Sequence, residues 1–247
     1  MTYCVGLKVR DGIVLIADTR TNAGLDNIAV FRKLHILNHP NQRVIALATA
    51  GNLAVSQAVI SYLAEGVTLD GHDEPLTLET TPSMFVTAQL VGKAIREVYR
   101  QDGEALEQSG GFDVQMLLAG QIAGRSVRLY QVYSAGNFIE ATTDTPYLQI
   151  GEHKYGKPIL DRAVQYETSL EDALKLSLIS MDSTMRSNLG VGMPIDTLVY
   201  RDGALEPEIE LRITDEDPYF TSLRNSWSDA LREAHLAIPA PPYWYGK

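Results

Sequence analysis

The sequence has few cysteines, few basic residues and no long apolar run. Its one cysteine, Cys4, cannot form an internal disulfide or build a cysteine-cluster metal site, which is typical of a protein from a reducing compartment. With 21 Lys and Arg against 31 Asp and Glu, the net charge of -10 disfavours general affinity for nucleic acid or anionic lipid. No stretch approaches the roughly 18 consecutive apolar residues of a membrane span. We therefore expect neither nucleic-acid binding nor membrane insertion.

Signals for export, metal binding and common catalytic motifs are also missing. The first residues lack the basic start, apolar stretch and cleavage site of a secretory signal, so we expect a cytoplasmic protein. Of the five histidines, only His35 and His39 are four apart, and they fall where a strand runs into a turn rather than on a helix. GxSxG, P-loop, GxGxxG and HExxH patterns do not occur. We expect no metal and no cofactor.

Apolar periodicity predicts alternating blocks of sheet and helix over one domain of 247 residues. Strands are predicted at 3–8, 13–17, 33–37, 43–48, 113–119, 127–133, 195–200 and 209–213, and helices at 53–63, 82–100, 158–166, 169–185 and 219–237. This order suggests two packed sheets with helices on both outer faces. The predicted fold class is α+β, a four-layer αββα sandwich.

Thr2 would become the first residue if an aminopeptidase removed Met1. A threonine hydroxyl is a weak nucleophile without an adjacent base, and a free N-terminal threonine supplies that base as its own α-amine. The pKa of an α-amine, about 7.7 to 8.0, suits general base work near neutral pH. Many proteins begin with Met-Thr for no catalytic reason, so Thr2 needs support from other residues.

Two charged residues lie where they could support Thr2. Asp18 ends an apolar strand whose hairpin partner starts beside Thr2, and Lys33 opens the next strand. A lysine near a carboxylate would stay charged, orient the hydroxyl and lower the pKa of the neighbouring amine. Taken singly, Asp18 could instead cap a turn and Lys33 could be a solvated strand end.

Several segments together resemble a proteasome β-type subunit and, more closely, Anbu, the bacterial ancestral-β-subunit family. The resemblance is carried by Thr2–Gly6, the DGxVLxAD segment, Asp18–Gly24, Lys33, Thr49–Gly51 and Met181–Asn188. It covers nearly the whole chain and implies the αββα fold of N-terminal-nucleophile hydrolases. It also implies that Thr2 is nucleophile and base, that Asp18 and Lys33 orient it, and that the backbone N–H of Gly51 donates to the oxyanion.

Two departures from the family pattern concern groups thought to tune the threonine amine. The serine that usually follows glycine in a GSG segment is replaced by Glu152. The later Asp-x-x-Ser-Gly-Gly pattern matches Asp182, with Met185 or, allowing an insertion, Ser187 at the serine position; we favour Ser187. Glu152 could be a substitute acid, a specificity group or a solvated carboxylate. These changes put ordinary peptidase turnover in question.

The C-terminal part, about 215–247, combines the helical stretch with prolines and three aromatic residues. It could dock on a neighbouring subunit or fold back on its own. The resemblance implies a homo-oligomer, a ring or an open spiral, acting on a peptide or protein substrate, with an unfoldase partner left open.

Three functions remain in competition at this stage. The first is a threonine endopeptidase. The second is an amidase or acyl-transfer enzyme that uses the same Thr2 chemistry on a small or isopeptide substrate. The third is a non-catalytic scaffold subunit, which would need neither Asp18 nor Lys33. A large sequestered chamber would favour peptides, and a closed pocket around Thr2 would favour small amides.

Overall fold

The computed structural model describes residues 1–22, 28–109 and 111–245, so Ala23 and Gly24 of the family pattern lie outside the described residues. The chain begins with an antiparallel hairpin of β1 (Tyr3–Val9) and β2 (Gly12–Asp18), which pair from Cys4↔Ala17 to Val9↔Gly12. All seven residues of β2 are buried, as expected for a strand that is covered on both faces. The predicted hairpin is confirmed.

This hairpin forms the centre of the first sheet, whose order is β10-β1-β2-β11-β12. The other strands are β10 (Tyr147–Gly151), β11 (Ile195–Arg201) and β12 (Ile209–Ile213). All neighbouring pairs in this sheet are antiparallel.

The second sheet has the order β5-β6-β7-β8-β9 and is also antiparallel. Its strands are β5 (Leu34–His39), β6 (Arg43–Gly51), β7 (Val114–Ile122), β8 (Arg128–Val132) and β9 (Phe138–Glu140). A short separate pair, β3 (Arg20–Asn22) and β4 (Ile28–Val30), follows β2.

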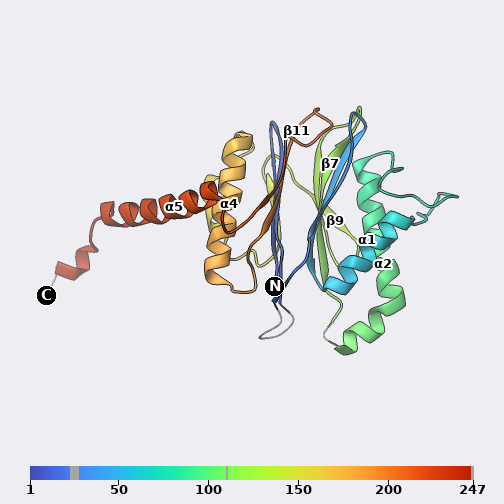
Figure 1. The fold of residues 1–247 in the computed structure, drawn as a ribbon, viewed down its shortest axis with the longest axis horizontal. Coiled ribbons are helices and arrows are strands. Elements are labelled where there is room, and N and C mark those ends of the chain that lie inside the picture. The colour runs from blue at the N-terminus through green and yellow to red at the C-terminus, as the bar shows by residue number, and fades with distance from the viewer. Residues whose placement is uncertain (23–27, 110, 246–247) are drawn as a thin grey trace.

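Helices cover the outer face of each sheet, which gives four layers (Figure 1). On one side lie α1 (Leu53–Glu65) and α2 (Met84–Ser109), and on the other α3 (Lys157–Ala163) and α4 (Leu170–Ser187). Asn52 and Ser169 accept hydrogen bonds from the first turns of α1 and α4, so both are N-caps. The predicted αββα sandwich is confirmed.

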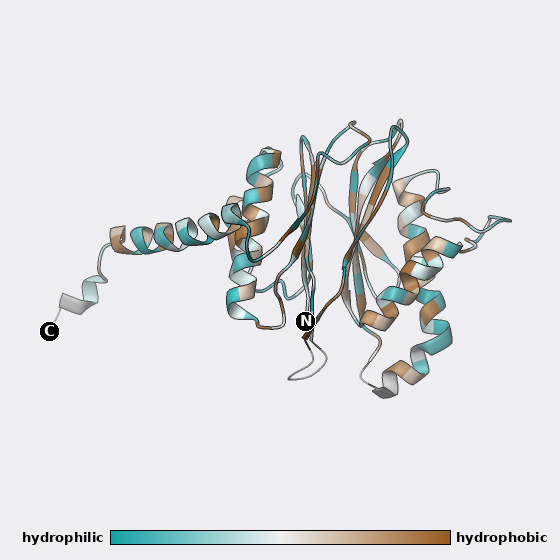
Figure 2. Ribbon diagram, in the orientation of Figure 1, coloured by the Kyte–Doolittle hydropathy of each residue, from teal (hydrophilic) through white to brown (hydrophobic). Residues whose placement is uncertain are grey.

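Apolar residues are frequent along the strands, as the brown segments of the ribbon in Figure 2 show, and their buried side chains form the core between the layers. Between the two sheets, small residues such as Ala46, Ala48 and Ala119 alternate with Leu15 and Leu117. This mixture lets two sheets approach closely without leaving a void. Two further apolar clusters, one for each sheet, lie between that sheet and its helices.

The C-terminal helix α5 (Pro218–Ala237) extends away from the sandwich, followed by the short 3-10 helix η1 (Pro242–Tyr245) (Figure 1). Only its first turns pack on the body, through buried Phe220 and Leu223. Exposed apolar side chains follow toward its end, among them Leu231, Leu236 and Ile238.

The strands β3, β4, β9 and β10 were not predicted from the periodicity. β3, β4 and β9 have only three residues, too few to show the alternation that marks a strand, and the five residues of β10 show no clear alternation. None of the described helices combines the length and the apolar character that crossing a membrane requires.

Candidate active site

Thr2 lies immediately before β1, at one end of the two packed sheets. Its residue is 8% exposed, whereas Met1 is 63% exposed. The Thr2 carbonyl oxygen accepts a hydrogen bond of 2.7 Å from the N–H of Glu152. A Cβ added to Gly151 would lie 2.0 Å from that same oxygen, so β10 can approach only because Gly151 has no side chain. The Thr2 backbone is therefore held by β10.

The Asp18 carboxylate lies next to Thr2 and accepts three hydrogen bonds. Lys33 Nζ donates to Oδ1 at 2.8 Å, the N–H of Tyr3 donates to the same oxygen at 3.0 Å, and the N–H of Gly192 donates to Oδ2 at 3.2 Å. Burial raises the pKa of the Asp18 carboxyl, while Lys33 and the two N–H groups act in the opposite direction. The hairpin register alone places Asp18 beside Tyr3.

Lys33 reaches this carboxylate from the second sheet, just before β5. Its Nζ also donates to the carbonyl oxygen of Arg20 at 2.6 Å, and its own carbonyl accepts from the N–H of Thr49 at 3.0 Å. Lys33 is 4% exposed, so the alternative of a solvated strand end does not describe it. An ammonium group this buried needs anionic and carbonyl partners, and it has both.

The loop before β11 completes the surroundings of Asp18. Besides the Gly192 N–H, it supplies the carbonyl of Pro194 to the Thr19 hydroxyl at 2.7 Å and that of Leu189 to Arg20 Nη1 at 3.1 Å. A Cβ at Gly192 would lie 2.2 Å from the Arg20 guanidinium carbon. Gly192 was not predicted from the sequence; the Gly-Val-Gly run at 190–192 is the signal that could have drawn attention to it.

Gly51 ends β6 with its N–H directed toward the cavity that holds Thr2. Thr49 N–H bonds to Lys33 on the β5 side, so in an antiparallel ladder the N–H of Gly51, two residues later, points to that side as well. The pairing of β5 with β6 begins at Leu34 and Ala48, so the Gly51 N–H lies beyond the end of this ladder. Gly51 has φ +103°, and an added Cβ would lie 2.4 Å from the Asp113 carbonyl oxygen.

These groups line a cavity of about 360 Å³. Its lining includes Thr2, Lys33 and Gly51 together with Met1 and Thr21. The buried Thr21 hydroxyl has no hydrogen-bond partner within the described part of the chain. The three predicted residues from separate segments therefore meet at one cavity, with Asp18 behind Lys33.

The supporting residues lie in three different places. Glu152 is half-buried and touches Thr2 through its backbone N–H. Asp182 is fully buried in α4, where Arg186 and Arg224 occupy its two oxygens at 2.9 and 2.7 Å. Ser187 is the exposed last residue of α4.

The arrangement brings together the kinds of group that acyl transfer to a hydroxyl would use. A hydroxyl, a buried ammonium and an outward backbone N–H surround one space, which is what attack on an amide carbonyl requires. Thr2 follows Met1, so its nitrogen is part of a peptide bond and becomes a free amine only after Met1 is removed. Over the described ranges, no group of three or more His, Cys, Asp or Glu residues could hold a metal ion.

Comparison with known proteins gives consistent relationships. The proteasome subunit family model matches residues 2–199. The structure of the helical assembly of the Anbu complex from Pseudomonas aeruginosa is 46% identical, with a TM-score of 0.90 over 98% of this chain and 99% of that one. Anbu (ancestral beta-subunit) from Yersinia bercovieri is 43% identical, with a TM-score of 0.88 over 97% and 98%. A proteasome subunit beta from Haloquadratum walsbyi is 26% identical over 83% of this chain and 75% of its own length.

Proposed function

The chain belongs to the proteasome subunit family, among its Anbu (ancestral β-subunit) members, and from this premise we propose that it is a threonine peptidase subunit. The nucleophile is Thr2, exposed by removal of Met1. The observation that carries the proposal is the convergence of Thr2, Lys33 and Gly51 on one cavity, with the Lys33–Asp18 ion pair buried behind it. A scaffold subunit would have no need to bury this pair.

In the proposed reaction the free α-amine of Thr2 takes the proton of the Thr2 hydroxyl as its oxygen attacks the substrate carbonyl carbon. The negative charge that develops on the carbonyl oxygen is met by the N–H of Gly51. The amine then returns the proton to the leaving amino group, and the C–N bond breaks. This leaves an ester between Thr2 and the acyl part of the substrate, which water hydrolyses with the same amine as base.

Lys33 and Asp18 position and tune this nucleophile. A positive Lys33 near the Thr2 amine favours the neutral form of that amine, since like charges repel, and the neutral form is the one that can accept a proton. Asp18 keeps Lys33 charged and in place through the 2.8 Å contact. A lost oxyanion donor typically costs on the order of a hundredfold or more in rate.

The supporting residues receive less direct roles in this proposal. Glu152 holds the Thr2 carbonyl through its N–H, and its carboxylate stands where related subunits carry a serine. Asp182 acts through α4, because both of its oxygens are engaged by arginines. Ser187, exposed at the end of α4, is proposed to tune the amine only once a neighbouring subunit or substrate covers it.

We further propose that the protein is a cytoplasmic homo-oligomer in which residues 215–247 contribute to the contact between subunits. The exposed apolar residues toward the end of α5 support this, because such a surface is stabilised by burial. One similar structure carries the description of a helical assembly. Analytical ultracentrifugation of the full chain and of a chain ending at residue 217 would test the role of α5.

Intact mass spectrometry tests the catalytic proposal. The intact mass of protein purified from its native host would be measured before and after treatment with a threonine-directed epoxyketone. This reagent needs both the hydroxyl and the free amine, and Thr2→Ala is the control. Loss of the Met1 mass and one label per chain, absent from Thr2→Ala, is the expected result. Retained Met1 without label would favour the scaffold function. A labelled protein that cleaves small amides but no peptide would favour the amidase.

A further inference from the structure

Among the described residues, no strand pairs with the outer edge of β10. Glu152 N–H bonds to Thr2 and Lys8 N–H bonds to Pro146, so the even-numbered residues of this segment face β1. In an antiparallel ladder the alternate residues face the other way. The N–H and C=O groups of Tyr147 and Gln149 therefore point outward, where β10 is the last strand in the order of its sheet.

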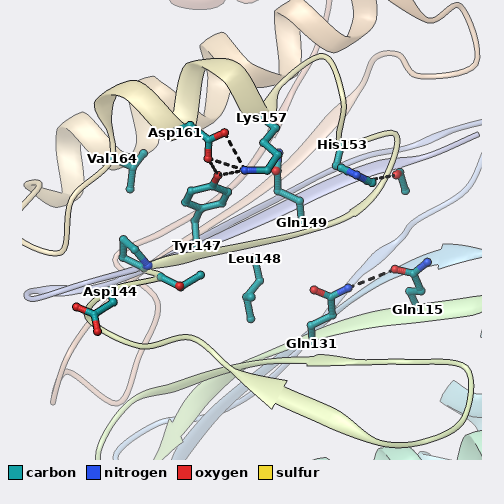
Figure 3. A pocket seen from close by; sticks show the side chains of 13 residues that line it. Gln115, Gln131, Asp144, Tyr147, Leu148, Gln149, His153, Lys157, Asp161 and Val164 are labelled. Atoms are coloured by element: carbon teal, nitrogen blue, oxygen red, sulfur yellow. Dashed lines mark hydrogen bonds and ion pairs between the residues drawn. The ribbon is translucent and has the colours of Figure 1, made fainter.

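A groove of about 580 Å³ lies along this edge. Figure 3 shows its two walls: Lys157 and Asp161 of α3 lie on one side of β10, and Gln115 and Gln131 of the second sheet lie on the other. The backbone of β10 thus forms the floor of the groove, between α3 and the second sheet. This geometry is that of domains that bind an extended peptide by adding it to a sheet edge.

The chemistry of the groove matches a polypeptide backbone better than a charged ligand. Lys157 and Asp161 neutralise one another at 2.6 and 2.8 Å, and Tyr147 joins this pair through hydrogen bonds to both. On the opposite wall Gln131 donates to Gln115 at 3.3 Å, which leaves further amide donors and acceptors facing the groove. A polyanion would find no unpaired cluster of positive charge on these walls.

We propose that this groove binds an extended segment of an unfolded polypeptide as an added strand on β10. Main-chain hydrogen bonds to Tyr147 and Gln149 supply most of the recognition, so binding tolerates many sequences. Side chains with amide or hydroxyl groups are favoured on the face toward Gln115 and Gln131. The chain's own tail is a poor occupant, because Pro239, Pro241 and Pro242 cannot donate backbone hydrogen bonds.

The groove runs toward the candidate active site. Gly151, the last residue of β10, pairs with Tyr3, and the N–H of Glu152 holds the Thr2 carbonyl. A strand bound along β10 would therefore keep a polypeptide close to Thr2 between encounters with the nucleophile. The binding itself does not depend on the chemistry proposed for Thr2.

The test uses the full-length protein with Thr2→Ala, so that no cleavage can occur. The probe is a short fluorescein-labelled peptide of alternating threonine and glutamine, chosen for the strand propensity of threonine and the amide of glutamine. Fluorescence anisotropy measures its affinity. Hydrogen exchange with single-amide resolution is then measured with and without peptide, and the amides of Tyr147 and Gln149 should slow severalfold.

A matched pair of variants separates the backbone from the side chain. Gln149→Pro removes the outward N–H without touching the ladder to β1, a position where an edge strand tolerates proline. Gln149→Ala removes the same side chain, including its 2.5 Å hydrogen bond to the Tyr3 hydroxyl, but keeps the N–H. Loss of one such bond should weaken peptide binding about fivefold in Gln149→Pro relative to Gln149→Ala.

Three results would overturn the proposal. The first is equal affinity of the two folded variants. The second is peptide protection confined to the Thr2 cavity with no change at residues 147–149. The third is strong protection of these amides in the absence of peptide, lost when the protein is diluted. That result would mean that a second copy of the chain covers the edge. If the circular dichroism spectrum shows that Gln149→Pro is not folded, the proposal is judged on hydrogen exchange of Thr2→Ala with and without peptide.

Discussion

Lys33 Nζ lies 2.8 Å from Asp18 Oδ1, and the two side chains are 5% and 0% exposed. The pair joins the two sheets, because Asp18 ends β2 and Lys33 precedes β5. Burial of two charges is tolerated here because carbonyl and N–H groups satisfy the remaining positions around them. The same pair thus contributes to the fold and to the candidate active site.

Replacing Lys33 by methionine should destabilise the protein strongly, because Asp18 would remain buried without its ammonium partner. Removing one member of a buried pair typically costs about 3–5 kcal/mol, and the free energy of unfolding in urea measures this. Lys175→Met is the matched control, since its partner Asp172 is exposed and an ion pair in water contributes little to stability. Similar losses in both variants would contradict a special role for Lys33.

The double variant Asp18→Asn with Lys33→Met should recover part of that loss, because the uncompensated charge is gone. Epoxyketone labelling of Thr2 should stay absent in the double variant even where stability returns. Labelling at the original rate would show that the pair does not tune Thr2.

Gly51→Ala should reduce turnover by about a hundredfold through displacement of the oxyanion N–H. The added Cβ would overlap the Asp113 carbonyl at 2.4 Å and would also have to accept φ +103°. Gly71→Ala is the control, since Gly71 has φ +86° with open space around the added Cβ. Single-turnover kinetics of peptide cleavage compare the two, and equal effects would mean that backbone strain alone is responsible.

Arg224→Ala should loosen α5 from α4, because Arg224 Nε donates to the buried Asp182 carboxylate at 2.7 Å. A hydrogen bond to a charged group contributes about 1.5–3 kcal/mol. Hydrogen exchange within α5 should therefore accelerate, and sedimentation should show weaker assembly. Arg100→Ala on α2 removes an exposed pair with Glu97, away from the proposed subunit contact, and should change neither measurement.

Acidification should destabilise the fold through His35. Burial, assisted by Arg32, lowers the pKa of His35 below its ordinary value of 6.5, while Asp196 acts in the opposite direction. Between that ordinary value and the lower folded-state value, the unfolded chain binds more protons, so the free energy of unfolding falls as pH falls. Urea unfolding at about pH 7.5 and about pH 5.5, on either side of the histidine pKa of ~6.5, measures the difference.

His35→Gln should reduce this pH dependence, because it removes the titrating group. His72→Gln, at an exposed position outside the strands, is the control. An unchanged pH dependence in His35→Gln would assign the effect to other residues.

Local patterns predicted most of the elements. The helices and most strands of five or more residues have a periodicity that can be recognised in the sequence, and the Asn52 and Ser169 caps mark two helix starts. Short edge strands carry too little pattern, and β10 forms because β1 offers it a partner. The groove beside β10 could therefore not be predicted at all.

The sequence by itself determined the two-sheet alternation, the chemistry available at Thr2 and the approach of Asp18 to Tyr3. These depend on residue type and on a hairpin whose register follows from its turn. Only the tertiary structure decided that Lys33 reaches Asp18 across the sheets, that Gly192 donates to the same carboxylate, and that Asp182 faces arginines. Such contacts join residues far apart along the chain, and it is the packing of whole layers, rather than any local preference, that brings them together.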